Sequence, residues 1–300
     1  MRLRHIEVFH AVYTTGSVTL AAKLLSISQP AVSKMLSHAE GQLGFGLFDR
    51  VKGRLVPTPE AHQLFQQAAN VYDCLGQFRE LSQNLNVGSA GNIRFSVTPA
   101  FSQEIVPRTI KAFLHDQPNV HVAVNTRHCS EVANGLINRQ IEFGVVFERA
   151  AVPGLVEQVL CSAEFVVLSP KGWLSESRER LSPSVLADIP FVRLNDRGPL
   201  GQLLRGHLDQ TAVRWNTIAT VGTYHIAKSL VVQGAGVSIV DEVTARSNGL
   251  DGVDLHFLEP ALSFKIKALW PESVPLSAPS KALLLSFKSE LESMLSRKTS

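Results

Sequence analysis

Residues 16–44, GSVTLAAKLLSISQPAVSKMLSHAEGQLG, decide the fold of the N-terminal part of this chain. Ser17 is a typical N-cap residue for a helix that contains two adjacent alanines, and such small residues let a neighbouring helix approach closely. Ser28 and Pro30 then mark the start of another helix, whose apolar stripe ends before Gly44. The sequence therefore predicts two short helices joined by a tight turn, which is the arrangement of a helix-turn-helix.

The segments on either side complete a larger domain. Residues 4–15 carry apolar side chains at helical spacing. On the other side, a strand begins near Phe48, residues 49–54 form a basic turn around a glycine, and residues 55–57 return. Such a hairpin presents cations to a phosphate backbone, as the wing of a winged helix does. We therefore expect an N-terminal winged helix-turn-helix, rich in α-helix, over residues 1–58.

Charge separates this N-terminal part from the rest of the chain. The 300 residues have a formal net charge of +3, but residues 1–58 contain seven Lys or Arg against three Asp or Glu. Their net charge of +4 leaves −1 for the remainder. A polyanion such as double-stranded DNA is therefore the expected partner of residues 1–58 alone.

Composition and motifs exclude several other classes of protein. Hydrophobic residues at 45% and charged residues at 18% are globular values, so a disordered or fibrous chain is excluded. No apolar run is long enough for a membrane span and no export signal is visible, so we expect a cytoplasmic protein without membrane contact. Three widely separated cysteines favour neither a disulfide framework nor a zinc site, and no metal or cofactor is predicted. Because no nucleophile elbow or phosphate-binding loop motif is present, we predict that the chain is not an enzyme.

The order and spacing of particular residues carry a family resemblance over most of residues 1–58. These residues are Leu3-Arg4-His5-Ile6-Glu7-Val8-Phe9, Gly16-Ser17, Ala21-Ala22, Leu24-Leu25, Ser28-Gln29-Pro30-Ala31-Val32-Ser33, Glu40, Leu43-Gly44, Leu47-Phe48, Arg50 and Pro57-Thr58. In them the chain resembles the DNA-binding head of LysR-type transcriptional regulators. Many members of that family carry arginine where this chain has Lys34, whose point charge lacks the planar fork that reads guanine.

Residue chemistry predicts roles within this head. Gln29 and Ser33, on the first turns of the third helix, are expected to contact base edges, and the basic residues are expected to bind phosphates. Ser28 either contacts a phosphate or only caps the helix, and Thr19 is either a phosphate contact or a plain surface residue. The predicted DNA-binding residues are Thr19, Ser28, Gln29, Pro30, Ser33, Lys34, Arg50, Lys52 and Arg54.

A long helix is predicted over residues 59–88. Its apolar stripe consists of Leu64, Ala68, Val71, Leu75, Phe78, Ser82 and Leu85, at alternating spacings of 4 and 3. This is the heptad pattern of a two-helix seam, although a helix packed on its own domain is the alternative. We favour a linker and dimerisation helix, as the resemblance also implies, because a homodimer can bind an inverted-repeat operator. The resemblance further implies a homotetramer made from two dimers, with RNA polymerase as a potential partner.

Residues 91–297 alternate strands with helices, which predicts parallel βαβ units. The predicted strands are 93–97, 120–124, 143–147, 165–168, 191–194, 218–221, 236–240, 254–258 and 264–270. The predicted helices are 102–116, 130–140, 182–188, 199–210, 223–233 and 279–297. The resemblance implies a two-lobed α/β effector-binding domain like that of periplasmic binding proteins, with crossovers near Ser162 and Leu262. Lobe I would cover about residues 91–162 and 266–297, and lobe II about residues 163–265.

Ligands of such folds bind between the lobes, where the C-terminal ends of strands converge. Hydroxyls and backbone amides at helix starts would hold a carboxylate there, whereas Asp241 or Glu148 would pair with an amine. Helix capping is the alternative role for Ser130, Thr223 and the aspartates, and wall packing is the alternative for Tyr224. The predicted effector-binding residues are Pro99, Ala100, Phe101, Ser102, His128, Ser130, Phe147, Asn195, Asp196, Thr223, Tyr224 and Asp241.

The stretches 97–103 and 234–241 resemble those of family members that sense basic amino acids or opine-like derivatives. We therefore predict that a small carboxylate-bearing metabolite, in the first place an amino acid or a derivative, modulates operator binding by favouring one arrangement of the lobes. Two alternatives stay open. One is a redox-sensing regulator that uses Cys129, with Cys161 as the resolving thiol. The other is a solute-binding protein without a DNA role, which the basic N-terminal part opposes.

Overall fold

The computed structural model describes residues 1–51, 54–86, 91–148, 151–174, 180–195, 198–211 and 213–296. For residues 54, 70, 73, 74 and 76–86 it describes the backbone alone. The chain forms two compact units, Met1–Gly88 and Ser89–Ser300. Among the described residues, no helix combines the length and the apolar character that crossing a membrane requires.

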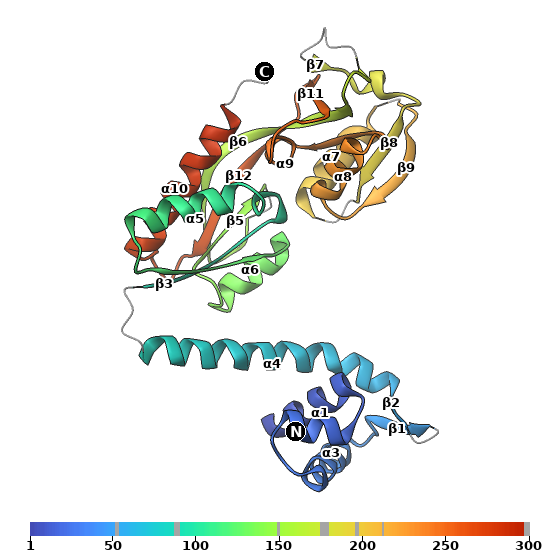
Figure 1. Ribbon diagram of the computed structural model, residues 1–300, viewed down its shortest axis with the longest axis vertical. Coiled ribbons are helices and arrows are strands. Elements are labelled where there is room, and N and C mark those ends of the chain that lie inside the picture. Colours follow the sequence, from blue (N-terminus) through green and yellow to red (C-terminus); the bar gives the residue numbers. More distant parts are fainter. Residues whose placement is uncertain are drawn as a thin grey trace. The chain divides into compact units, whose positions relative to one another are not determined.

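The described residues of the N-terminal unit form three short helices, a β-hairpin and a long helix (Figure 1). Its elements are α1 Leu3–Thr15, α2 Val18–Leu24, α3 Gln29–Leu43, β1 Phe48–Val51, β2 Arg54–Pro57 and α4 Pro59–Asn86. Ser17 Oγ accepts a hydrogen bond from Leu20 N at the start of α2, and Ser28 Oγ accepts one from Ala31 N at the start of α3. The predicted winged helix-turn-helix is confirmed.

The core of this unit lies between its short helices and the first turns of α4. Phe9 of α1 and Ala21 of α2 are fully buried, because the small alanine side chain lets the two helices approach closely. Ala61 and Ala68 of α4 belong to the same buried cluster, and Leu64 packs against it. The beginning of the predicted heptad stripe therefore covers the core of its own unit.

The C-terminal unit contains the remaining elements (Figure 1). In chain order they are β3 Asn92–Val97, η1 Pro99–Phe101, α5 Ile105–Asp116, β4 His121–Thr126, α6 Cys129–Ile137, β5 Phe143–Phe147, β6 Leu155–Pro170, β7 Arg180–Leu181, η2 Pro183–Leu186, β8 Pro190–Leu194, α7 Pro199–Asp209, β9 Asn216–Val221, α8 Tyr224–Val232, β10 Val237–Asp241, α9 Glu242–Arg246, β11 Val253–Leu258, β12 Ser263–Pro271 and α10 Ala278–Leu295. The elements η1 and η2 are short 3-10 helices.

Two lobes are built on one path of paired strands, in the order β4-β3-β5-β12-β6-β10-β8-β9. In lobe I, β3 pairs in parallel with β4 and β5, and in lobe II, β8 pairs in parallel with β9 and β10. Strand β6 runs through both lobes (Figure 1), because it pairs with β12 up to Glu164 and with β10 from Phe165 onward. The two-lobed α/β architecture is thus confirmed.

The strand directions differ in part from the prediction of parallel units. β6 runs antiparallel to β10, β11 and β12, and β12 also runs antiparallel to β5. The physical reason is that a parallel pair needs a crossover helix, whereas β6 carries the chain directly from one lobe to the other. The predicted strand 165–168 is only the second half of β6, and the predicted helix 182–188 is the short η2.

A chain of phenylalanines in tilted and edge-to-face contact links lobe I to the point where β6 changes lobes. Ring centroids lie 4.9 Å apart between Phe101 and Phe147, 5.2 Å between Phe147 and Phe264, and 5.1 Å between Phe264 and Phe165. All four rings are buried. This packing gives η1, which follows the first strand of lobe I, a rigid support.

Candidate DNA-binding and effector sites

The N-terminal end of α3 exposes the side chains that are predicted to contact bases. Gln29 and Lys34 are exposed, and Ser33 is half-buried. Gln29 Nε2 donates a hydrogen bond to Ser33 Oγ over 3.3 Å, so the two predicted base-reading groups lie together. Ser28 is also exposed, and its hydroxyl accepts a hydrogen bond from the backbone of α3, which gives this residue a capping role.

The other predicted DNA contacts lie on α2, α3 and the hairpin. Thr19 is exposed at the start of α2, and Pro30 is exposed in the first turn of α3. Arg50 is exposed on β1, in register with Leu55 of β2. Two predicted cations fall beyond what the structure describes, namely the whole of Lys52 and the side chain of Arg54.

Glu40 attaches the hairpin to α3. Its Oε1 accepts hydrogen bonds from Leu47 N at 2.8 Å and from Phe48 N at 3.3 Å, just where β1 begins. This role of Glu40 was not predicted from the sequence. One feature of the sequence could have indicated it, because Glu40 is an acidic residue on the helix that is expected to face DNA. A carboxylate near DNA phosphates is repelled, so it is favourable there only when it binds donors of the protein itself.

The parallel pairings of each lobe bring the predicted effector residues to the C-terminal ends of strands. Phe101 and Phe147 are buried in the core of lobe I and support the loop after β3, and Ala100 is buried beside them. Pro99 and Ser102 are half-buried, and Ser102 Oγ donates a hydrogen bond to the Pro99 carbonyl oxygen over 2.6 Å.

His128 and Ser130 are exposed at the start of α6, the helix that follows β4. The backbone N–H of His128 donates a hydrogen bond to Glu131 Oε2 over 2.7 Å. Within the described residues, neither side chain is bonded to the other predicted effector residues. The structure therefore joins Ser102 to Pro99 by a hydrogen bond, whereas His128 and Ser130 follow the neighbouring strand β4, which is paired in register with β3.

The start of α8 holds two predicted residues of lobe II. Thr223 Oγ1 accepts a hydrogen bond from Ile226 N, so Thr223 caps the helix. The pKa of Tyr224 lies well above its ordinary value because the phenol is buried and lies near the Asp241 carboxylate. Of the remaining predicted residues, Asn195 lines a pocket beside α7, and Asp196 lies outside the described residues.

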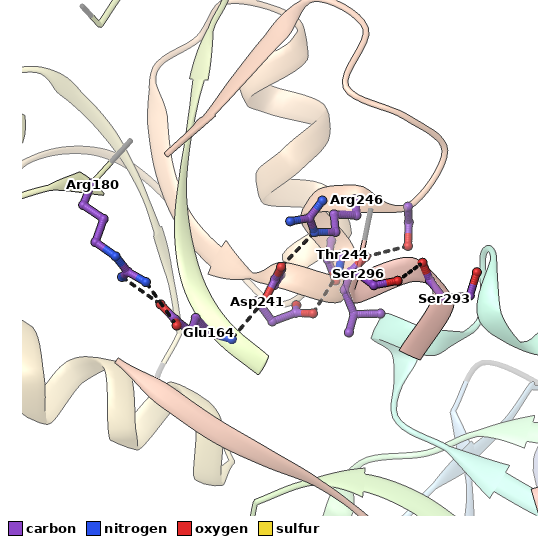
Figure 2. Close-up of polar contacts among 10 residues, drawn as sticks. Glu164, Arg180, Asp241, Thr244, Arg246, Ser293 and Ser296 are labelled. Carbon is purple, nitrogen blue, oxygen red and sulfur yellow. Dashed lines mark hydrogen bonds and ion pairs between the residues drawn. The ribbon is translucent and has the colours of Figure 1, made fainter. Parts of the chain in front are cut away.

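Asp241 is the last residue of β10 and the N-cap of α9. Its side chain is fully buried, and Oδ1 accepts a hydrogen bond from Thr244 N over 2.8 Å (Figure 2). Burial raises the pKa of Asp241 to about 6, although the hydrogen bond from the Thr244 backbone N–H and the charge of His225 act in the opposite direction. Asp241 Oδ2, Thr244 Oγ1 and the Tyr224 hydroxyl are all buried, and none has a hydrogen-bond partner among the described residues.

A charged network beside Asp241 fixes α9 to the point where β6 changes lobes. Arg180 contacts the Glu164 carboxylate twice, at 3.0 Å and 3.3 Å (Figure 2). Glu242 accepts a hydrogen bond from Arg246 Nε over 2.8 Å and another from Glu164 N over 3.3 Å. At the other end of α9, Lys228 Nζ donates to three backbone carbonyls, those of residues 245, 247 and 249. Hydrogen bonds therefore fix both ends of α9 to the surrounding structure.

Direct hydrogen bonds join the two lobes near this buried group. His225 Nε2 donates to the Pro99 carbonyl oxygen over 2.9 Å. Asn248 N donates to Glu104 Oε2 over 2.8 Å, and Asn248 Nδ2 donates to Gln103 Oε1 over 3.2 Å. Sequence reasoning did not assign these contacts, because they connect residues that are more than a hundred positions apart.

The two described cysteines do not favour the redox alternative. Cys161 lies on β6, and burial raises the pKa of its thiol to about 11. A raised pKa lowers the fraction of reactive thiolate, which is unfavourable for a resolving cysteine. Cys129 is half-buried and packs against the apolar cluster that contains Val132 and Leu136.

Comparisons with known proteins agree with this geometry. A family model described as "LysR substrate binding domain" matches residues 86–292, and one described as "Bacterial regulatory helix-turn-helix protein, lysR family" matches residues 3–62. The HTH-type transcriptional regulator DgcR of Pseudoalteromonas sp is 42% identical over 277 residues, which cover 92% of this chain and 95% of that protein. The transcriptional activator protein LysR of Escherichia coli (strain K12) is 28% identical over 295 residues, which cover 98% and 94%.

A solved structure shares the fold over nearly the whole length. Full-length CbnR in complex with its target DNA superposes with a TM-score of 0.71 at 18% sequence identity, and the match covers 98% of this chain and 100% of that chain. At this identity the similarity concerns the fold alone.

Proposed function

Because the chain belongs to the LysR family of DNA-binding transcriptional regulators, we propose that a small metabolite with both a carboxylate and an amine, such as an amino acid, binds between its lobes and modulates its binding to DNA. The relatives in the comparison are regulators and not enzymes, in agreement with the absence of a catalytic motif.

The observation that carries the proposal is the buried polar group of Asp241 Oδ2, Thr244 Oγ1 and the Tyr224 hydroxyl. Leaving such a group without a partner costs about 1–3 kcal/mol. A cationic amine suits this place because it supplies donors for all three oxygen atoms and the opposite charge for the carboxylate. A simple carboxylic acid without an amine would leave Asp241 unpaired and would add a second negative charge.

The carboxylate of the same metabolite would bind at the start of α8. The first N–H groups of a helix attract anions, and the Thr223 hydroxyl lies at this helix start. Tyr224, the next residue, lies close enough to the Asp241 carboxylate to interact with its charge. An amine and a carboxylate on neighbouring atoms of one small molecule would thus meet complementary groups on either side of Tyr224.

The hydrogen bonds between the lobes supply a way for the effector to act. A ligand changes a conformational equilibrium only by binding one state better than the other. The bonds from His225 to Pro99 and from Asn248 to Glu104 exist only when the lobes are close together. An effector that binds beside them favours one lobe arrangement, and we propose that this arrangement sets how the DNA-binding units are presented to the operator.

We also propose that the chain acts as a homodimer or homotetramer on an inverted-repeat operator. Leu64 and Ala68 cover the core of the N-terminal unit, but Val71, the next position of the stripe, is exposed. The stripe beyond Leu75 falls on side chains outside the described part. A second copy packed along this part of α4 would bury Val71 and place two α3 helices on one DNA duplex.

Calorimetric titration of the full-length protein with a panel of amino acids tests the effector class. We expect heat from at least one amino acid, and a loss of binding of about tenfold or more in Asp241→Asn, which keeps the cap but removes the charge. Asp254→Asn is the matched control, because Asp254 also accepts a backbone hydrogen bond, from Gly172 N, in lobe II.

Binding of aromatic acids alone would overturn the proposed effector class. Equal loss of binding in Asp241→Asn and Asp254→Asn would show that Asp241 acts only through the fold. A retained operator response in Cys129→Ser would separately remove the redox alternative.

A further inference from the structure

We propose that lobe II carries a second small-molecule site, beside α7, for an organic anion with an apolar body. The site is a pocket of about 290 Å³ between α7 and the strands β8 and β9, which we call the α7 pocket. Its apolar floor consists of Phe191, Leu204 and Leu208, all of which are buried. The volume is close to the lower end of the range for small-ligand pockets, about 300 Å³.

The charged residues that line the α7 pocket, within the described chain, are both arginines. Arg193 projects from β8 and Arg205 from α7, with exposed side-chain fractions of 35% and 55%. Asp209, at the end of α7, lies 3.7 Å from Arg193 Nη2 and 3.3 Å from Arg205 Nε. One carboxylate, that of Asp209, therefore faces both guanidinium groups at the edge of the pocket.

Polar groups next to the arginines complete the recognition surface. Thr220 of β9 is directly in register with Arg193, and Asn195 follows the end of β8 in the same pocket. A guanidinium matches the planar geometry of a carboxylate, and a hydroxyl and an amide provide further hydrogen-bonding groups. The apolar floor lies beside this polar edge, so the ligand that fits best is a monocarboxylate with a compact ring or branched chain.

The α7 pocket is distinct from the proposed effector site around Asp241. Successive strand residues point to opposite faces of a sheet. Phe191 and Arg193 of β8 face the α7 pocket, whereas Val192, between them, packs with Ala227 and Val231 of α8. The helix that begins at Tyr224 therefore lies on the other face of the sheet, and a ligand in the α7 pocket would act alongside the effector.

Cyclohexanecarboxylate and its neutral amide form a matched pair of probes. In calorimetric titrations of the full-length protein, we expect the carboxylate to bind at least tenfold more tightly than the amide. Arg193→Gln should weaken carboxylate binding about tenfold, and Arg205→Gln should weaken it as well. Arg214→Gln is the matched control, because Arg214 is exposed in the same lobe but does not line the pocket.

The Asp241→Asn variant separates this site from the proposed effector site. We expect Asp241→Asn to bind cyclohexanecarboxylate with unchanged affinity, whether or not its response to amino acids is lost. Circular dichroism of each variant verifies that it is folded. Loss of carboxylate binding in folded Asp241→Asn, equal binding of acid and amide, or unchanged binding in both pocket-arginine variants would each overturn the proposal. So would the absence of carboxylate binding to the unmodified protein.

Discussion

His225 in lobe II donates a hydrogen bond from Nε2 to the backbone carbonyl of Pro99 in lobe I, with 2.9 Å between the two atoms. A carbonyl oxygen only accepts hydrogen bonds, so the imidazole carries a proton on Nε2. The same oxygen also accepts the Ser102 hydroxyl. The first loop of lobe I and the first turn of α8 are thereby fixed to each other beside the buried Asp241.

Removing the imidazole should loosen the two lobes. We expect His225→Ala to lower the free energy of unfolding of the C-terminal unit by about 1 kcal/mol, the usual net contribution of one hydrogen bond. Urea denaturation of the full-length protein measures this change. His115→Ala, an exposed histidine on α5, is the control and should have little effect. If both variants lose the same stability, the bond to Pro99 does not hold the lobes together.

Asp241 should make the C-terminal unit more stable at mildly acidic pH. Its pKa is raised from 3.8 to about 6, so between these values the folded chain binds a proton that the unfolded chain has lost. Stability due to this group is therefore present at low pH and is lost as the pH rises from about 4 to 6. Lowering the pH from 7 to 5 should therefore raise the contribution of Asp241 to the free energy of unfolding by about 1 kcal/mol.

The Asn variant isolates this contribution from those of other titrating groups. Asp241→Asn cannot ionise, so its change in unfolding free energy between pH 7 and pH 5 should be smaller than that of the unmodified protein by about 1 kcal/mol. Urea denaturation at both pH values gives the two differences. Identical pH dependence in the two proteins would contradict a buried, titrating Asp241.

Replacing Gly236 and Gly206 by alanine should change the free energy of unfolding in opposite directions. A Cβ on Gly236 would lie 2.3 Å from the Pro190 carbonyl oxygen, so Gly236→Ala must push β10 away from β8. We expect a loss of about 1–3 kcal/mol in unfolding free energy. A Cβ on Gly206, inside α7, meets nothing within 4 Å. Gly206→Ala should therefore gain about 0.5–1 kcal/mol from helix propensity, and thermal unfolding of both variants measures the difference.

Glu40 should be necessary for the position of the hairpin. Glu40→Ala removes the acceptor for the backbone N–H groups of Leu47 and Phe48, so we expect a loss of about 1–3 kcal/mol in stability and weaker DNA binding. Glu40→Gln keeps one oxygen acceptor, so its stability and DNA affinity should lie between those of the unmodified protein and those of Glu40→Ala. Denaturation and fluorescence anisotropy with operator DNA provide the measurements. Tighter DNA binding in both variants would instead mean that Glu40 acts mainly by repelling phosphates.

Gln29 and Lys34 should affect DNA binding in different ways. We expect Gln29→Ala to relax sequence preference at one base pair, at a cost of about 1–3 kcal/mol on the preferred operator. Lys34→Gln should weaken binding to all sequences and reduce the slope of log affinity against log salt by about 1. Anisotropy titrations at several salt concentrations separate these effects. A base-specific loss in Lys34→Gln would contradict the assignment of Lys34 to phosphates.

Local signals in the sequence determined the elements of this protein. Ser17 and Ser28 begin helices, because their hydroxyls satisfy backbone N–H groups that every helix start leaves unpaired. The apolar periods of residues 93–97 and 143–147 likewise correspond to β3 and β5. These interactions span only a few residues, so the alternation of residue types is sufficient to predict them.

The tertiary structure alone decided which of these elements meet. The contact from His225 to Pro99 spans 126 positions, and the role of Glu40 depends on a hairpin that folds back onto α3. The buried state of Asp241, the antiparallel course of β6 and the α7 pocket likewise arise from packing between distant segments. Residue type sets which bonds a side chain is able to form, but desolvation and charge depend on neighbours that only the folded chain supplies.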